Sequence, residues 1–140
     1  MKRIGWVIVA VAAGLALAGC ATSAPEPPST EPDIRGVVTS VSDAGDGASF
    51  RVVWTNDDAV GAQEDYDAAQ VTANAATEIL TRAADGSVTD AAVDDIAVGT
   101  VVEAWFEGPV AESYPVQATA GAVVILGSYS GELPEPPGLQ

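Results

Sequence analysis

The chain has 140 residues, with 20 acidic side chains, 5 basic side chains and no histidine. Its formal charge of −15 repels nucleic-acid phosphates, so nucleic acid is excluded as a partner. Because histidine is absent, histidine-based triads are excluded. The single lysine is Lys2 and the single cysteine is Cys20, so Schiff-base chemistry depends on Lys2 alone and thiol catalysis on Cys20 alone. The length indicates one domain with flanking segments.

The first 20 residues have the pattern of a secretory leader. A basic start is followed by an apolar run at residues 4–16 and by Leu-Ala-Gly-Cys at residues 17–20. This order resembles the lipobox of bacterial lipoproteins. The resemblance implies a signal peptide over residues 1–19, diacylglyceryl transfer to Cys20 and anchoring on the extracytoplasmic face of the cell membrane. An ordinary signal peptide or an N-terminal anchor helix is the alternative.

Such processing removes Lys2, which excludes Schiff-base chemistry, and leaves three arginines and twenty acidic residues, a formal charge of −17. With Cys20 lipidated, no intramolecular disulfide is available, so the fold depends on its apolar core. Residues 20–32 are rich in Pro, Ser, Thr and Glu, which predicts a disordered tether. Residues 33–127 form the predicted domain, and residues 128–140 a second disordered segment.

Within the domain, residues 34–42 and 49–56 are rich in β-branched and aromatic side chains. The second run alternates with a period of two, and the turn-forming segment 43–48 joins it to the first, so the two runs predict a hairpin. Gly36 within the first strand predicts a bulge or a tight bend. A polar loop is expected at residues 57–67.

Two strand pieces follow at residues 68–74 and 77–82, and a short helix is predicted for residues 89–96, capped by Thr89 or Asp90. The last two strands are expected at residues 100–107 and 117–126. This order of three strands, a short helix and two strands predicts an all-β fold with one short helix, namely a five-stranded OB-fold-like Greek-key barrel. A five-stranded half-sandwich is the alternative.

Residues 98–126, "VGTVVEAWFEGPVAESYPVQATAGAVVIL", resemble the end of the YobA-like family of small bacterial lipoproteins. The match is carried by Gly99, Trp105, Gly108, Pro109, Glu112, Ser113, Tyr114, Pro115, Gln117 and Ala118, and it extends more loosely to the hairpin from Ile34 and to the predicted helix. The resemblance implies a lipobox, a tether and an OB-like barrel, and it implies no activity. The last strand here has no basic residue, which argues against anion binding.

The segment at residues 107–117 contains two prolines, Pro109 and Pro115, which predict a stiff connection between the last two strands. We interpret it as a plug that lays the Tyr114 ring over the barrel end. Because this connection borders the usual OB binding face, the alternative is a ligand-binding rim. The candidate rim residues are Glu107, Glu112, Ser113, Tyr114 and Gln117.

The aromatic residues and the acidic loops are interpreted as structural. Trp54, Trp105 and Phe106 are interpreted as core or rim residues, with Trp105 buried and Phe106 partly exposed, because a stacking site for nucleic acid needs a basic groove. The acidic loops with Asp43 and Asp46, and with Asp57, Asp58, Glu64, Asp65 and Asp67, lack the EF-hand pattern and are interpreted as solvated turns. We therefore predict no metal and no cofactor.

Carboxylate chemistry remains open in principle, through a pair drawn from Glu103, Glu107 and Glu112. A domain of this size has little room for a deep cleft, so we predict that the protein is not an enzyme. The sequence predicts a monomeric binding or accessory module of the cell envelope, whose partner is an unidentified envelope protein or small ligand. The alternatives are a structural envelope protein without a ligand and a carboxylate-dependent hydrolase.

Overall fold

A computed structural model describes residues 24–135. Its elements are β1 (Ile34–Asp43), β2 (Ala48–Val53), β3 (Ala68–Ala73), β4 (Glu78–Arg82), β5 (Val88–Asp90), the 3-10 turn η1 (Val93–Asp95), β6 (Thr100–Ala111) and β7 (Val116–Ser128). The predicted signal peptide, Cys20 and residues 136–140 lie outside the described residues. Between residues 24 and 135, no helix has the length and apolar character needed to cross a membrane.

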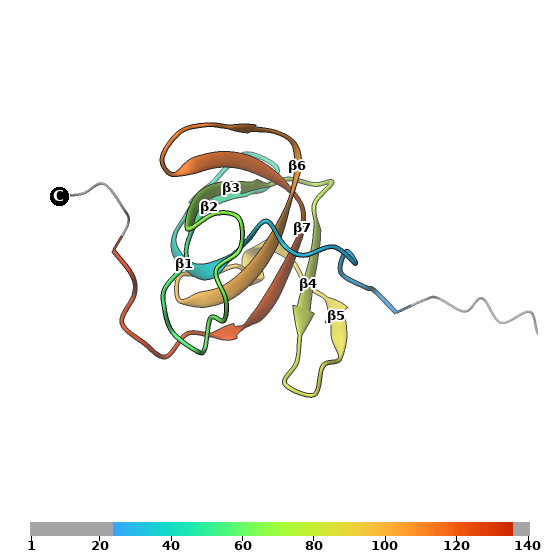
Figure 1. Cartoon of the computed structure of the whole chain (residues 1–140). Coiled ribbons are helices and arrows are strands. Elements are labelled where there is room, and N and C mark those ends of the chain that lie inside the picture. Colours follow the sequence, from blue (N-terminus) through green and yellow to red (C-terminus); the bar gives the residue numbers. More distant parts are fainter. Residues whose placement is uncertain (1–23, 136–140) are drawn as a thin grey trace, which may run out of the picture.

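Five strands close into a barrel in the order β3-β2-β1-β6-β7, and β7 pairs again with β3 (Figure 1). The closing pair is parallel and runs from Ala69 opposite Val116 to Thr72 opposite Thr119. The other pairs within the barrel are antiparallel. This is the arrangement of an OB-like barrel, so the predicted all-β, five-stranded fold is confirmed, and closure of the sheet excludes the half-sandwich.

β7 is long enough to pair with two strands in succession. Beyond its contact with β3 it pairs in parallel with β4, from Glu78 opposite Ala122 to Thr81 opposite Ile125. The chain bends between β3 and β4 at Asn74, whose side-chain oxygen accepts a hydrogen bond from the Ala76 N–H at 2.8 Å. β5, which we did not predict as a strand, pairs with β4 outside the barrel.

The prediction of a short helix at residues 89–96 is wrong. The predicted caps, Thr89 and Asp90, lie in β5, where pairing with β4 satisfies the backbone in a ladder instead of a helix. Only η1 remains helical, as one 3-10 turn. Its first turn is closed by Asp95, whose Oδ2 accepts a hydrogen bond from the Ala92 N–H at 2.8 Å.

The predicted hairpin of β1 and β2 is confirmed, but its irregularity lies elsewhere. The register shifts between Val38 and Ser40, so the bulge is not at Gly36. A Cβ placed on Gly36 would lie 2.5 Å from the carbonyl oxygen of Val53. Glycine is therefore needed here because the backbone of β1 closely approaches the end of β2.

Apolar side chains from all five barrel strands, from β4 and from the segment after η1 fill the barrel. They are Ile34, Val38, Phe50, Val52, Ala69, Val71, Ala73, Ile79, Ile96, Val102, Ala104, Ala120, Val123 and Ile125. On β2 and β3 these inward residues alternate with polar ones, as a half-buried strand requires. Burial of this apolar surface is the main contribution that stabilises the fold.

A second apolar cluster lies outside the barrel, on β6, β7 and β4. It consists of Leu80, Trp105, Ala122 and Val124. These residues alternate along their strands with inward-facing ones, so they face away from the barrel interior. The predicted burial of Trp105 is confirmed, at 8% exposure, but in this outer cluster. Phe106 is half-buried, as expected, and packs against the barrel core.

The N-terminal strap, which we define as residues 30–33, lies against β6 (blue in Figure 1). The Trp105 indole N–H donates to the Thr30 carbonyl oxygen at 2.8 Å. The Asp33 N–H donates to the Ala104 carbonyl oxygen at 2.9 Å, and Asp33 Oδ2 accepts from the Phe106 N–H at 2.7 Å. The last residues of the segment interpreted as a tether therefore contact the barrel.

A buried ion-pair network lies on β1, β6 and β4. Glu103 is 6% exposed, and Arg35 donates to its Oε1 from Nε at 3.1 Å and from Nη2 at 2.8 Å. Arg82 Nη1 lies 3.5 Å from the other oxygen, Oε2. Arg35 also pairs with Glu64 at 3.0 Å. Each oxygen of the Glu103 carboxylate thus faces an arginine, and this pairing is needed because an unpaired buried carboxylate is strongly unfavourable.

We expect Glu103→Gln to lower the free energy of unfolding by about 2 kcal/mol, because both arginines lose their shared carboxylate. The effect is smaller than for a fully buried pair, since the side chains of Arg35 and Arg82 are 19% and 34% exposed. Urea denaturation of residues 24–135 measures it. The exposed Glu78→Gln on β4 is the control and should change stability by less than about 0.5 kcal/mol. Equal stabilities of the two variants would contradict the prediction.

Candidate functional site

The hairpin of β6 and β7 is longer than predicted. β6 continues to Ala111 and β7 begins at Val116, so most of the segment expected to be a loop is strand, and its tip is residues 112–115. The pairing is irregular here, because the register shifts between Glu107 and Ala111. At the tip, Ser113 Oγ donates to the Pro115 carbonyl oxygen at 2.8 Å, and Gln117 Nε2 lies 3.5 Å from Ser113 Oγ. The structure therefore brings the side chains of Ser113 and Gln117 together, and Tyr114 follows Ser113 at the same tip.

The other two predicted rim residues are exposed, but only one lies at the tip. Glu112 is exposed at the tip itself. Glu107 is exposed further down the hairpin, where it lies opposite Thr119. The predicted rim is thus divided between the tip and the body of the hairpin.

Tyr114 is 62% exposed, so the interpretation of this residue as a plug is wrong. Its hydroxyl donates to Asp67 Oδ2 at 3.1 Å. Desolvation of the hydroxyl, together with this hydrogen bond to a carboxylate, raises the pKa of Tyr114. Instead, Tyr66 and Phe106 pack against the barrel core, with their ring centroids 5.6 Å apart. The aromatic residue that covers this part of the core therefore comes from the loop between β2 and β3.

Because its ring is exposed, Tyr114→Ala should change the free energy of unfolding by less than about 0.5 kcal/mol. Tyr66→Ala is the matched variant and should cost about 2 kcal/mol, because its ring packs against the barrel core. Urea denaturation of residues 24–135 compares them. If Tyr114→Ala lowered the free energy of unfolding more than Tyr66→Ala does, the interpretation of Tyr114 as a plug would be supported after all.

The outer polar face lies between the β1–β2 turn and the β6–β7 tip, on the outside of β2, β3 and β7. We define it by six side chains: Ser49, Arg51, Gln70, Thr72, Gln117 and Thr119. All six are at least partly exposed, whereas the residues that alternate with them on these strands are buried, or half-buried in the case of Val116. In OB-like barrels, the strands and loops at this position form the usual binding surface.

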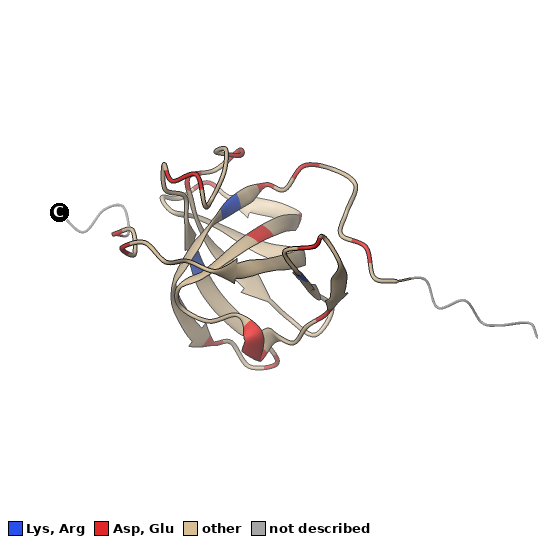
Figure 2. Ribbon diagram, turned by 90° about the horizontal axis from the view of Figure 1, so that it is seen from below, with Lys and Arg blue, Asp and Glu red and all other residues tan. Residues whose placement is uncertain are grey.

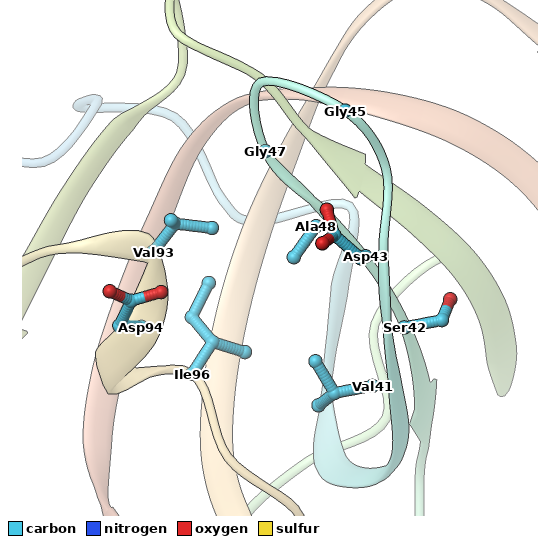
Figure 3. A pocket seen from close by; sticks show the side chains of 9 residues that line it. All are labelled: Val41, Ser42, Asp43, Gly45, Gly47, Ala48, Val93, Asp94 and Ile96. Atoms are coloured by element: carbon cyan, nitrogen blue, oxygen red, sulfur yellow. The ribbon is translucent and has the colours of Figure 1, made fainter.

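A pocket of about 470 Å³ lies between the β1–β2 turn and η1 (Figure 3). Val41, Val93 and Ile96 give it an apolar wall, and the carboxylates of Asp43 and Asp94 lie on opposite sides (Figure 3). Sequence reasoning missed this pocket. The available signal was Val41, an apolar residue between Ser40 and Ser42 in the first predicted strand. In the structure it lies opposite the inward-facing Phe50 and is 39% exposed.

A second pocket, of about 380 Å³, lies between the N-terminal segment, β6 and β7. Trp105 and Phe106 line it, together with the three acidic residues Asp33, Glu78 and Glu107. Trp54 lies elsewhere and has a structural role: it is half-buried against a cluster of valines, and its indole N–H donates to the Gly61 carbonyl oxygen at 3.2 Å.

Acidic residues gather mainly on loops and turns (Figure 2). Among residues 24–135, no three of the potential ligands Asp, Glu, His and Cys come together as a metal site would require. Asp57 bonds to the Ala59 N–H at 2.9 Å and to the Tyr129 hydroxyl at 2.9 Å, and these hydrogen bonds lower its pKa. Of the glutamates considered for a catalytic pair, Glu103 is held by two arginines.

No curated protein and no solved structure matches the chain significantly. One family model matches, over residues 51–127, which is more than half of the chain. The match runs from the middle of β2 to the end of β7 and so includes the outer polar face except Ser49, together with the β6–β7 tip. The chain therefore belongs to the family described as a protein of unknown function, DUF3221.

Proposed function

We propose that this protein is a lipid-anchored binding module on the extracytoplasmic face of the cell membrane, held through Cys20. It presents the outer polar face and the β6–β7 tip to its ligand. The order of basic start, apolar run and Leu-Ala-Gly-Cys supports the anchor. The resemblance of residues 98–126 to YobA-like lipoproteins supports the same assignment.

The observation that carries the binding role is the exposed ring of Tyr114. A large aromatic side chain usually contributes more to folding stability when it is buried. The ring of Tyr114 is instead 62% exposed, while its hydroxyl donates a hydrogen bond to Asp67. Exposed tyrosines of fixed orientation are common contact residues at binding surfaces, because little conformational entropy is lost when they bind. Its position next to the usual OB binding surface favours the same role.

Capture from solubilised envelope membranes tests the binding role. We expect the full chain to retain a discrete envelope component, and Tyr114→Ala to lose at least nine-tenths of it. Gln63→Ala, an exposed substitution in the β2–β3 loop, is the control and should capture as the wild type does. Capture that is diffuse, or equal for Tyr114→Ala and the wild type, would favour a structural envelope protein without a ligand.

Cys20→Ser should move the protein from the membrane fraction to the soluble fraction, because no diacylglyceryl group can then be attached. Each buried CH₂ group of an acyl chain contributes about 0.8 kcal/mol to membrane binding, so the acyl chains should provide most of the membrane affinity. Fractionation followed by immunoblotting measures the distribution, and Thr22→Ser serves as the neighbouring control. Retention of a processed Cys20→Ser protein in the membrane would count against lipidation.

A further inference from the structure

We propose that the ligand of the outer polar face is a neutral polysaccharide chain, an inference that rests on the proposed binding function. The six side chains form two rows across three adjacent strands. In the first row, Arg51 lies opposite Gln70, and Gln70 lies opposite Gln117. The second row is two residues away from the first on each strand and consists of Ser49, Thr72 and Thr119. Such rows present their polar groups on one side of the sheet.

Hydrogen bonds within the face hold some of these side chains in place. Arg51 Nε donates to Gln70 Oε1 at 3.3 Å, and Gln70 Nε2 donates to Ser49 Oγ at 2.8 Å. The bonds join the two rows and leave other guanidinium N–H groups of Arg51 available to a ligand. A surface whose side chains are ordered before binding loses less conformational entropy when it binds.

The rows continue onto β1, where Ser40 lies opposite Arg51 and Ser42 lies opposite Ser49. Four adjacent strands therefore carry hydroxyl, amide or guanidinium groups at two successive levels. With neighbouring strands about 4.8 Å apart, the surface extends about 14 Å across the strands. This span suits several units of a chain polymer better than one small molecule.

The chemistry of the face matches sugar hydroxyls. Amide and hydroxyl side chains both donate and accept hydrogen bonds, as sugar hydroxyls do. The chain has 20 acidic residues, yet none belongs to either row, and Arg51 is the only charged member. One carboxylate borders the face, since the exposed Glu107 on β6 lies opposite Thr119 at the end of the second row. The rows themselves carry no acidic group that would select a cation, while the net charge of −15 opposes anionic polymers.

Tyr114 supplies the apolar part of the recognition. It lies at the β6–β7 tip beside Ser113, whose Oγ is 3.5 Å from Nε2 of Gln117, the last member of the first row. An aromatic ring offers a flat apolar surface to the C–H groups of a sugar, while its hydroxyl remains bound to Asp67. The two pockets differ from this face, since acidic side chains line both of them.

Affinity electrophoresis of the full chain in a non-ionic detergent tests the inference. The gels contain dextran, mannan or xylan as neutral polymers, or alginate as an anionic one. We expect retardation by at least one neutral polymer and none by alginate. Gln70→Ala/Gln117→Ala should weaken this binding at least tenfold, and Tyr114→Ala should weaken it as well. The matched control is Gln63→Ala/Thr89→Ala, two exposed polar residues outside the face, which should bind as the wild type does.

Circular dichroism and urea denaturation of each variant confirm that the fold is retained. The inference is overturned if no neutral polymer retards the chain, if the double variant binds as tightly as its control, or if alginate binds equally well. Capture of an envelope protein that depends on Tyr114, without binding to any neutral polymer, would sustain the binding module and reject the polysaccharide. Failure of both experiments would reject both proposals.

Discussion

Trp105→Ala is expected to lower the free energy of unfolding by about 4 kcal/mol, the upper range for truncation of a buried aromatic residue. The ring is 8% exposed and is the largest side chain of a cluster that contains Leu80, Ala122 and Val124. Its removal leaves a cavity on the outside of β6 and β7 and also breaks the hydrogen bond to the Thr30 carbonyl oxygen. Urea denaturation of residues 24–135 gives the value.

Trp105→Phe separates packing from the hydrogen bond. It keeps an aromatic ring but removes the indole N–H, whose loss should account for about 1 kcal/mol. In a chain that begins at residue 34, which lacks the N-terminal strap, this hydrogen bond is already absent, so the substitution should cost less than in residues 24–135. A loss below about 1 kcal/mol for Trp105→Ala would show that the outer cluster contributes little to stability.

The barrel could be predicted because its strands carry short-range signals. The alternation of Phe50, Val52 and their polar neighbours, and the turn-forming residues after β1, depend only on sequence order. These signals indicated the hairpin and the number of strands in the barrel. They do not distinguish the two faces of a strand that is covered on both sides, so Trp105 was correctly predicted to be buried while its place outside the barrel was not.

The choice between Tyr66 and Tyr114 illustrates what sequence order leaves open. Both lie in polar connections, and either ring could be expected to cover exposed core. The prolines around Tyr114 favoured that residue, yet Tyr66 packs on the core and Tyr114 remains exposed. The outcome depends on the length of β6 and β7, whose pairing continues to Ala111 opposite Gln117. Long-range pairing of this kind is not visible in a local pattern.

The outer polar face was not predicted for a similar reason. Arg51, Gln70 and Gln117 are separated in sequence and each lies in an ordinary alternating strand. They become one row only through the antiparallel pairing of β2 with β3 and the parallel pairing of β3 with β7. The predicted rim residue Gln117 belongs to this row, so the sequence located one edge of the surface.

Gly36→Ala should lower the free energy of unfolding by about 3 kcal/mol, at the upper end of the range for inserting a methyl group into a packed site. The added Cβ would lie 2.5 Å from the Val53 carbonyl oxygen and 2.9 Å from the Trp54 nitrogen. Both are backbone atoms of a strand end held within the barrel, so no side-chain rotation can relieve the contact. The control is Gly121→Ala, whose Cβ would meet the Glu107 side chain at 3.4 Å and should change stability by less than about 0.5 kcal/mol. Urea denaturation of residues 24–135 distinguishes them, and a Gly36→Ala variant as stable as Gly121→Ala would mean that β1 can move away from β2 without loss of the barrel.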